Sequence, residues 1–230
     1  MERQYTQNSI FIFYIMEIVI NENKYYIPKA WNEITLGSFM DYMAQYNEED
    51  SEARKQLVLV STLTGAPKPL LEKAKKNVID QAIEELNKVM QVEASKQLNL
   101  IIEIDGIEYG FHPNLHELRL KEFVDLDNKL SNGWESMNEV MAILYRPLTK
   151  KKGDKYNIEE YDFKTAKKRA EMFKQELSVD TVNGAAAFFL NIAVGYLKIT
   201  QEYSKLNRRT RRKLSKQKKN YLTKGTAGTL

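Results

Sequence analysis

The two histidines are the first residues to test for chemistry, because imidazole is a common general base and metal ligand near neutral pH. They are His112 and His116, four residues apart with Pro113 between them. On a continuous helix this spacing would place both rings on one face, but Pro113 argues against such a helix, and no acidic third ligand lies at motif spacing. We therefore expect no metal site and no cofactor here, and interpret both as surface or junction histidines.

Other catalytic patterns are missing from the sequence as well. The chain contains no cysteine, so a thiol nucleophile, a thiolate zinc site and a disulfide are excluded. Neither glycine-rich phosphate-binding pattern occurs. The acidic residues form solvated runs that sequence alone does not pair as acid and base. The sequence predicts a protein that acts by binding, and leaves open only an active site assembled from distant segments.

Charge divides the chain into two regions. The formal net charge is +4, but residues 205–224 hold ten basic residues and no acidic residue, which leaves the remainder at −6. A block of like charge repels itself and tends to stay solvated. We expect this basic tail to bind nucleic acid or an acidic protein surface. The candidate residues are Arg208, Arg209, Arg211, Arg212, Lys213, Lys216, Lys218 and Lys219.

The longest early apolar run covers residues 10–20. It contains Glu17 and is shorter than the roughly 20 residues that a membrane-spanning helix needs. The residues before it carry no net positive charge, and no small-residue cleavage site follows, so a signal peptide is disfavoured. We expect no membrane span and a cytoplasmic location. Met16 starts a strand-like segment, and residues 1–15 are interpreted as a possible N-terminal extension.

The elements that position any site follow a weak internal duplication at an offset of 84 residues. Apolar and aromatic residues align across the two halves: Ile18, Ile20, Tyr25, Leu36 and Phe39 with Ile102, Ile104, Tyr109, Leu120 and Phe123. Each half is expected to open with a β-hairpin, which turns at residues 21–23 in the first half and at Asp105–Gly106 in the second.

Beyond each hairpin the apolar residues recur with the helical period of about 3.6. Leu36, Phe39 and Met40 form one stripe, and Leu120, Phe123 and Val124 form another. Ser178 is a plausible N-cap for the last helix, which is apolar nearly all round and therefore expected to be buried. Further helices are predicted over residues 52–63, 69–90, 135–144, 165–176 and 179–203. The predicted fold is α+β with helix predominating, divided into an extension (1–15), two halves (16–98 and 99–204) and the basic tail (205–230).

One segment of the second half combines residues that are typical of protein interfaces. An apolar helix ends before Pro147, which restricts the preceding residue to extended geometry, and a basic, glycine-containing loop is expected to follow. Arginine and tyrosine are enriched at binding hot spots. The candidate partner-binding residues are Tyr145, Arg146, Pro147, Lys150, Lys151, Lys152, Tyr156 and Tyr161. An equally weighted alternative is a surface loop in which Arg146 makes a structural salt bridge.

The chain resembles a group of small proteins encoded by tailed bacteriophages. The resemblance covers most of residues 16–203 and is carried by five segments: the first hairpin with Trp31, then residues 34–39, 142–147, 154–156 and the apolar stretch 184–189. Proteins with such patterns are taken to be tail assembly chaperones or related morphogenesis factors. The resemblance implies binding to tape measure or tail tube protein while a tail is built, without catalysis.

The leading hypothesis is therefore a phage assembly factor of the host cytoplasm, which covers an aggregation-prone tail component through exposed grooves or strand edges. The basic tail departs from this pattern and keeps two alternatives open. One is a structural virion protein near the head–tail junction, in contact with the connector. The other is an accessory protein that binds nucleic acid through the tail, with an affinity that falls steeply as salt rises.

Overall fold

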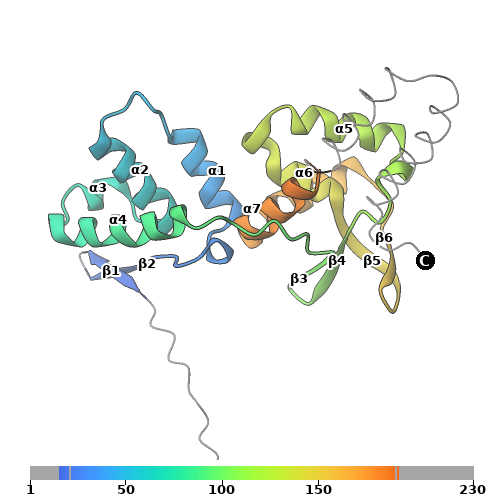
Figure 1. The fold of residues 1–230 in the computed structure, drawn as a ribbon, viewed down its shortest axis with the longest axis horizontal. Coiled ribbons are helices and arrows are strands. Elements are labelled where there is room, and N and C mark those ends of the chain that lie inside the picture. Colours follow the sequence, from blue (N-terminus) through green and yellow to red (C-terminus); the bar gives the residue numbers. More distant parts are fainter. Residues whose placement is uncertain (1–15, 21, 190, 192–230) are drawn as a thin grey trace, which may run out of the picture.

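The computed structural model describes residues 16–189 except residue 21, together with residue 191. Helices predominate over strands, which confirms the predicted α+β fold. The elements form two lobes that lie side by side along the longest axis (Figure 1). None of the described helices is long and apolar enough to cross a membrane. The predicted extension over residues 1–15 and the basic tail over residues 205–230 lie outside the described residues.

The first lobe begins with the predicted hairpin, in which the buried Ile18 and Ile20 alternate with the exposed Glu17 and Val19. The predicted helix over residues 52–63 is confirmed, but the single helix predicted over 69–90 is wrong, because a short helix and a long one are separated by residues 72–75. The elements are β1 (Glu17–Ile20), β2 (Asn23–Tyr26), η1 (Trp31–Glu33), α1 (Leu36–Gln45), α2 (Glu52–Thr64), α3 (Lys68–Leu71) and α4 (Lys76–Gln91).

The second lobe contains an antiparallel sheet in the order β3-β4-β5-β6. Its first turn is the predicted Asp105–Gly106 pair, and both residues have positive φ, as a two-residue hairpin loop requires. The elements are β3 (Ile101–Ile104), β4 (Ile107–Phe111), η2 (Leu115–Glu117), α5 (Leu120–Leu130), η3 (Gly133–Ser136), α6 (Met137–Leu144), β5 (Tyr145–Lys152), β6 (Lys155–Ile158), α7 (Phe163–Glu176) and a last helix whose described part covers residues 179–189.

The basic segment after α6 is a β-hairpin and not the loop that we predicted. The chain passes from Leu144 directly into β5, and Pro147 keeps it extended. β5 pairs with β4 on one side and with β6 on the other, so each half of the strand gains hydrogen-bond partners. Gly153 lies in the turn with a φ of 60°, a conformation that favours glycine.

The two lobes repeat their element order at the predicted offset of 84 residues. β1 and η1 correspond to β3 and η2 with the same bounds, and α1 and α5 begin at equivalent residues, Leu36 and Leu120. Buried positions also correspond, as in the pairs Ile27 and Phe111, Val60 and Leu144, and Ala82 and Ala166. The main departure is the β5–β6 hairpin, which replaces α3 in the second lobe.

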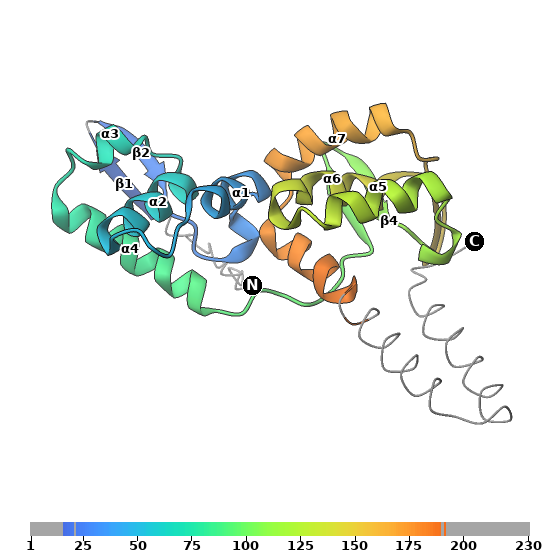
Figure 2. The ribbon, with the colours of Figure 1, turned by 90° about the horizontal axis from the view of Figure 1, so that it is seen from above.

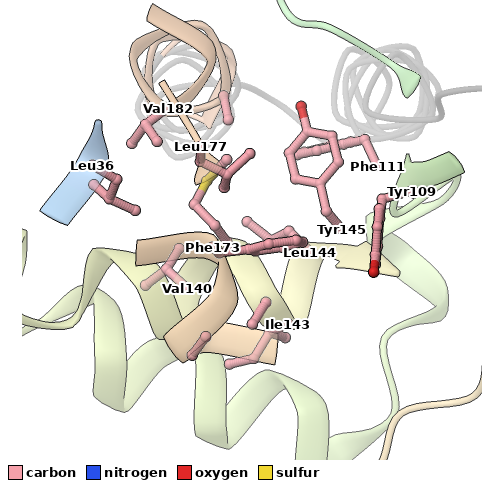
Figure 3. Packing of buried hydrophobic residues seen from close by; sticks show 14 of the residues in the cluster. Leu36, Tyr109, Phe111, Val140, Ile143, Leu144, Tyr145, Phe173, Leu177 and Val182 are labelled. Carbon is pink, nitrogen blue, oxygen red and sulfur yellow. The ribbon is translucent and has the colours of Figure 1, made fainter. Parts of the chain in front are cut away.

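Each lobe has its own hydrophobic core, and the two cores exchange one fully buried residue each. In the second lobe, Phe111, Leu144, Tyr145 and Phe173 pack together (Figure 3). Leu36 of the first lobe also belongs to that core, whereas Val179, which follows α7, belongs to the core of the first lobe. The lobes therefore share apolar contacts that are independent of the chain segment linking them.

Backbone hydrogen bonds fix this junction between the lobes. The N–H of Leu36 donates to the carbonyl of Leu177 at 2.7 Å, and the N–H of Val179 donates to the carbonyl of Ile34 at 2.9 Å. Beside them the Phe39 and Trp134 rings meet edge to face, with centroids 4.8 Å apart. The start of α1 is thus clamped by an extended segment of the second lobe.

The last helix is anchored at its start and its described part packs on more than one side. Ser178 is its N-cap, as predicted, because its hydroxyl oxygen accepts a hydrogen bond from the N–H of Thr181 at 3.3 Å. Val182 and Ala185 are buried, Phe188 and Phe189 are half-buried against Phe111, and Gly184 is buried against the carbonyl of Gln97, so none of residues 179–189 is exposed. Figure 2 shows the segment after α4 passing beside this helix, where Asp180 accepts a hydrogen bond from the N–H of Ser95. The rest of the helix predicted to residue 203 lies outside the described residues, except residue 191.

The repeat allows a matched test of the junction. Leu36 is fully buried between the lobes, and its equivalent Leu120 is 79% exposed. We expect Leu36→Ala to lower the free energy of unfolding by about 2–5 kcal/mol, because it removes a packed side chain. Leu120→Ala should change it by no more than about 0.5 kcal/mol. Urea unfolding of both variants measures the difference, and equal effects would contradict the assignment of Leu36 to the junction.

Candidate functional site

A polar cleft of about 300 Å³ opens between the start of α5 and the strands β5 and β6. The sequence-predicted Arg146 and Tyr161 line it together with His112, which sequence analysis had not connected with them. Its other lining residues are Pro113, Glu117, Arg119, Glu122, Thr149, Asn157, Ile158, Glu159 and Glu160. The cleft therefore joins residues of α5, β5 and β6 with those that directly follow β4 and β6.

A buried ion pair holds the inner wall of this cleft together. The Arg146 Nη1 and Glu122 Oε1 atoms are 2.7 Å apart, and their side chains are 3% and 4% exposed. Glu122 also accepts the N–H of Arg119 at 2.8 Å, which closes the first turn of α5. Burial lowers the pKa of the Arg146 guanidinium, and Glu122 acts against this shift. The geometry supports the structural salt bridge that sequence analysis had offered as the alternative for Arg146.

One donor of that guanidinium remains unsatisfied. Among the described residues, the Arg146 Nε atom is the only buried side-chain nitrogen or oxygen without a hydrogen-bond partner. A buried polar group without a partner destabilises the fold, so the ion pair has to offset this cost. The pair consequently makes the cleft wall sensitive to the loss of either partner.

His112 is buried in the same wall, at the junction between β4 and η2. Burial lowers its pKa to about 4, and the nearby positive charge of Arg146 adds to the shift. Its Nδ1 atom accepts a hydrogen bond from the N–H of Asn114 at 3.3 Å, so the neutral ring carries its proton on Nε2. His112 is therefore a buried junction histidine. The side chain of His116 lies outside what the structure describes.

Other charged side chains around the cleft form ion pairs. Glu160 forms an exposed ion pair with Arg119, and Glu159 pairs with Arg169, which also donates to the carbonyl of Ala142. Tyr161 donates to Asp125 at 2.7 Å, and burial followed by this carboxylate raises its pKa. No group of three or more potential metal ligands occurs among the described residues. The ion pairs and hydrogen bonds around the cleft mainly fix α5 against the β5–β6 hairpin.

Two of the predicted partner-binding tyrosines lie in the protein interior. Tyr145 donates its hydroxyl to the carbonyl of Asn99 at 2.6 Å, and Tyr156 donates to the carbonyl of Phe111 at 2.7 Å. Both rings are buried, so they stabilise the sheet and are not accessible to a partner in this conformation. In β6, Tyr156 lies between the exposed Lys155 and Asn157, an alternation that is typical of a half-buried strand.

The remaining predicted residues divide between surface and interior. Pro147 is half-buried and lies opposite Tyr109 in the sheet. Lys150, Lys151 and Lys152 are exposed along β5, and Lys151 forms an ion pair with Glu108 of β4. The candidate nucleic-acid-binding residues Arg208, Arg209, Arg211, Arg212, Lys213, Lys216, Lys218 and Lys219 lie outside the described residues.

An exposed apolar stripe on α5 is the feature that sequence analysis did not assign to a site. Phe123 is 55% exposed, and Leu120 and Val124 on the same helical face are also exposed. The opposite face carries the buried Glu122 and Leu126. α5 therefore turns a carboxylate inward and three apolar side chains outward. We call Leu120, Phe123 and Val124 the α5 stripe.

An apolar hollow of about 350 Å³ lies on the same lobe, between the end of α5, α6 and the last helix. It is lined by Leu130, Met137, Val140, Met141, Leu144, Ala185, Ala186 and Phe189. Leu130 is itself exposed at the end of α5. Apolar surface is thus available at both ends of this helix.

Comparison with protein-family models, curated proteins and solved structures finds no match for the chain. The geometry of the described residues and the sequence patterns are therefore the observations on which a function has to be argued.

The ion pair in the cleft gives a direct prediction. Glu122→Ala should lower the free energy of unfolding by about 3–5 kcal/mol, because Arg146 is left as an unpaired buried charge. Glu160→Ala, which breaks the exposed pair with Arg119, should cost less than about 1 kcal/mol. A double variant, Glu122→Leu with Arg146→Met, should recover most of the loss. Denaturant unfolding tests all three, and a small effect of Glu122→Ala would show that the pair is dispensable.

His112 predicts a pH dependence of stability. Its folded pKa of about 4 lies below the usual value of 6.5, so the unfolded chain binds more protons between these values. The stabilisation is complete above pH 6.5 and is lost as the pH falls toward 4. Across this window His112 contributes a slope of at most about 1.4 kcal/mol per pH unit. Subtracting the pH profile of His112→Gln from that of the wild type isolates this slope, and superimposable profiles would refute it.

Proposed function

We propose that the protein is a non-enzymatic assembly factor of a tailed bacteriophage, a tail assembly chaperone that binds tape measure or tail tube protein in the host cytoplasm. The resemblance of most of residues 16–203 to small tail morphogenesis proteins supports this function. The single structural observation that carries it is the α5 stripe, because a chaperone must expose apolar surface before its client arrives.

The proposed mechanism is reversible burial of apolar surface. Contact with a client removes exposed side chains of α5 from water, which is worth roughly 25 cal/mol for each Å² of apolar surface. The buried ion pair beneath α5 holds the helix in place, so little ordering has to accompany binding. A limited patch favours a complex that later dissociates, when the client polymerises into the tail.

The exposed lysines of β5 add electrostatic steering to this mechanism. Lys150, Lys151 and Lys152 follow one another along the hairpin that forms another wall of the polar cleft. A row of positive charge accelerates encounter with an acidic surface. Added salt screens this attraction, so the association rate falls as the salt concentration rises. We therefore expect the client to present acidic residues near its apolar contact.

A second candidate function rests on the basic tail. Ten positive charges between residues 205 and 224 favour binding to nucleic acid, and a virion protein near the head–tail junction would contact packaged DNA. In that case the protein would remain in the mature particle. Its affinity for DNA would decrease steeply between low and physiological salt, and removal of the residues after Tyr203 would abolish it.

Co-expression with each tail protein of the same phage tests the proposed function. We expect the tape measure or tail tube protein to become more soluble and to co-purify with this protein, while a capsid or portal protein does not. Mass spectrometry of purified virions should find the protein missing or far below stoichiometric amounts. Stoichiometric retention in virions, or the lack of any complex with a tail protein, would overturn the assignment as a chaperone.

A further inference from the structure

The sequence contains the dipeptide Asn–Gly at two places, and the fold puts them in different surroundings. Asn132–Gly133 lies between the end of α5 and the first residue of η3. Asn183–Gly184 lies within the last helix. Because the two dipeptides have the same local sequence, a difference in their reactivity has to come from the fold.

An asparagine that precedes a glycine can lose its side-chain amide in water without an enzyme. The backbone nitrogen of the glycine attacks the side-chain carbonyl carbon Cγ and gives up its proton. The bond between Cγ and the amide nitrogen breaks, ammonia leaves, and a cyclic succinimide forms. Water then opens the ring at either of its carbonyl groups and yields aspartate or isoaspartate. Asparagine is thermolabile in proteins, and a following glycine leaves the attacking nitrogen unhindered and its backbone free to rotate.

The fold leaves the first dipeptide open to this reaction. Asn132 and Gly133 are both exposed. Gly133 has a φ of 60°, and apart from its chain neighbours no described heavy atom lies within 4 Å of the place where a Cβ would be. The turn and loop hydrogen bonds of the described residues include none from the N–H of Gly133. Its nitrogen can therefore approach the Asn132 side chain by rotation within a turn.

The carboxamide of Asn132 has one hydrogen bond in the folded protein. Its Nδ2 atom donates to the hydroxyl oxygen of Ser136 at 3.0 Å. A single hydrogen bond between neutral groups contributes little net free energy, because water replaces it when it breaks. This contact therefore does not hold the carboxamide against rotation toward the nitrogen of Gly133.

The second dipeptide is enclosed by its own helix and by the segment after α4. Gly184 is buried, and an added Cβ would lie 2.1 Å from the carbonyl oxygen of Gln97. Residues 179–189 are helical, so the N–H of Gly184 faces the carbonyl of Asp180 four residues earlier. Attack on Asn183 requires the helix to open first, and only a minor population of the folded protein is open at any time.

We propose that Asn132 is a site of spontaneous deamidation in the folded protein, with water as the co-reactant and ammonia as the leaving group, and that the fold protects Asn183. The reaction needs no partner protein, so this inference is independent of the proposed function.

The modification site lies next to the junction between the lobes. Isoaspartate would add a methylene group to the main chain between α5 and η3 and would remove the donor to Ser136. Trp134 follows two residues later, and its ring contacts Phe39 at the junction. The new carboxylate would also lie at the C-terminal end of α5, where the helix dipole disfavours negative charge. We therefore expect the modified protein to be less stable than the unmodified protein.

Incubation of the full-length protein in mildly alkaline buffer, followed by proteolytic digestion and peptide mass spectrometry, tests the proposal. Fragment spectra assign the mass increase from amide to carboxyl to one residue. We expect this increase to accumulate at least about tenfold faster at Asn132 than at Asn183, because the helix around Asn183 has to open before it can react.

The same incubation in concentrated urea is the matched control, because the unfolded chain presents both dipeptides without their surroundings. The two rates should then become similar. Asn132→Gln should remove the reaction at residue 132 in the folded protein and leave Asn183 unchanged, because a longer side chain would have to form a larger ring. Circular dichroism checks that this variant is folded.

Equal rates at the two asparagines of the folded protein, or a faster rate at Asn183, would overturn the proposal. So would a rate at Asn132 that is more than about tenfold lower in the folded protein than in urea, because the turn would then protect it as the helix protects Asn183. Ion exchange separates the modified protein by its additional negative charge. Its midpoint of urea unfolding should be lower than that of the unmodified protein, and identical midpoints would refute the effect on the junction.

Discussion

The exchange between residues 34–36 and 177–179 is the contact on which the two-lobed arrangement depends. Two backbone hydrogen bonds place Leu36 in the second core and Val179 in the first. Each core is completed by a residue of the other lobe, so neither lobe buries its apolar surface fully by itself. This reciprocity explains how a small inter-lobe contact gives a defined relative position, although the linking segment is long. The same contact fixes the start of the last helix against α1.

The buried ion pair of the second lobe positions α5 against β5. Glu122 satisfies both Arg146 and the N–H of Arg119, so one carboxylate links β5 to the first turn of α5. A buried pair adds little net stability, because desolvation offsets most of its attraction, but it penalises any arrangement that separates the partners. Burial and, to a smaller extent, the positive charge of Arg146 lower the pKa of His112, which stays neutral beside the pair. The orientation of the α5 stripe follows from this inward anchor.

The sequence predicted the local features and missed those that depend on distant contacts. The Asp105–Gly106 turn, the Ser178 cap and the 84-residue offset were predictable, because each rests on residues close in sequence or on a repeated pattern. The β5–β6 hairpin was not, since three consecutive lysines are typical of a solvated loop and become a strand only by pairing with β4 and β6. The candidate site was predicted in part. Arg146 and Tyr161 line the cleft, but the interior position of Tyr145 and Tyr156 depends on the sheet around them, and an apolar helical stripe looks the same in sequence whether it is covered, as in α1, or exposed, as in α5.

The junction has a consequence for the order of events during synthesis. The residues of the first lobe up to α4 leave the ribosome well before residues 177–179, and at ordinary elongation rates this interval lasts roughly 5–20 s. Throughout it the apolar face at the start of α1 lacks the residues 177–179 that contact it in the finished protein. A growing chain therefore exposes at the start of α1, for a short time, apolar surface that the finished protein covers.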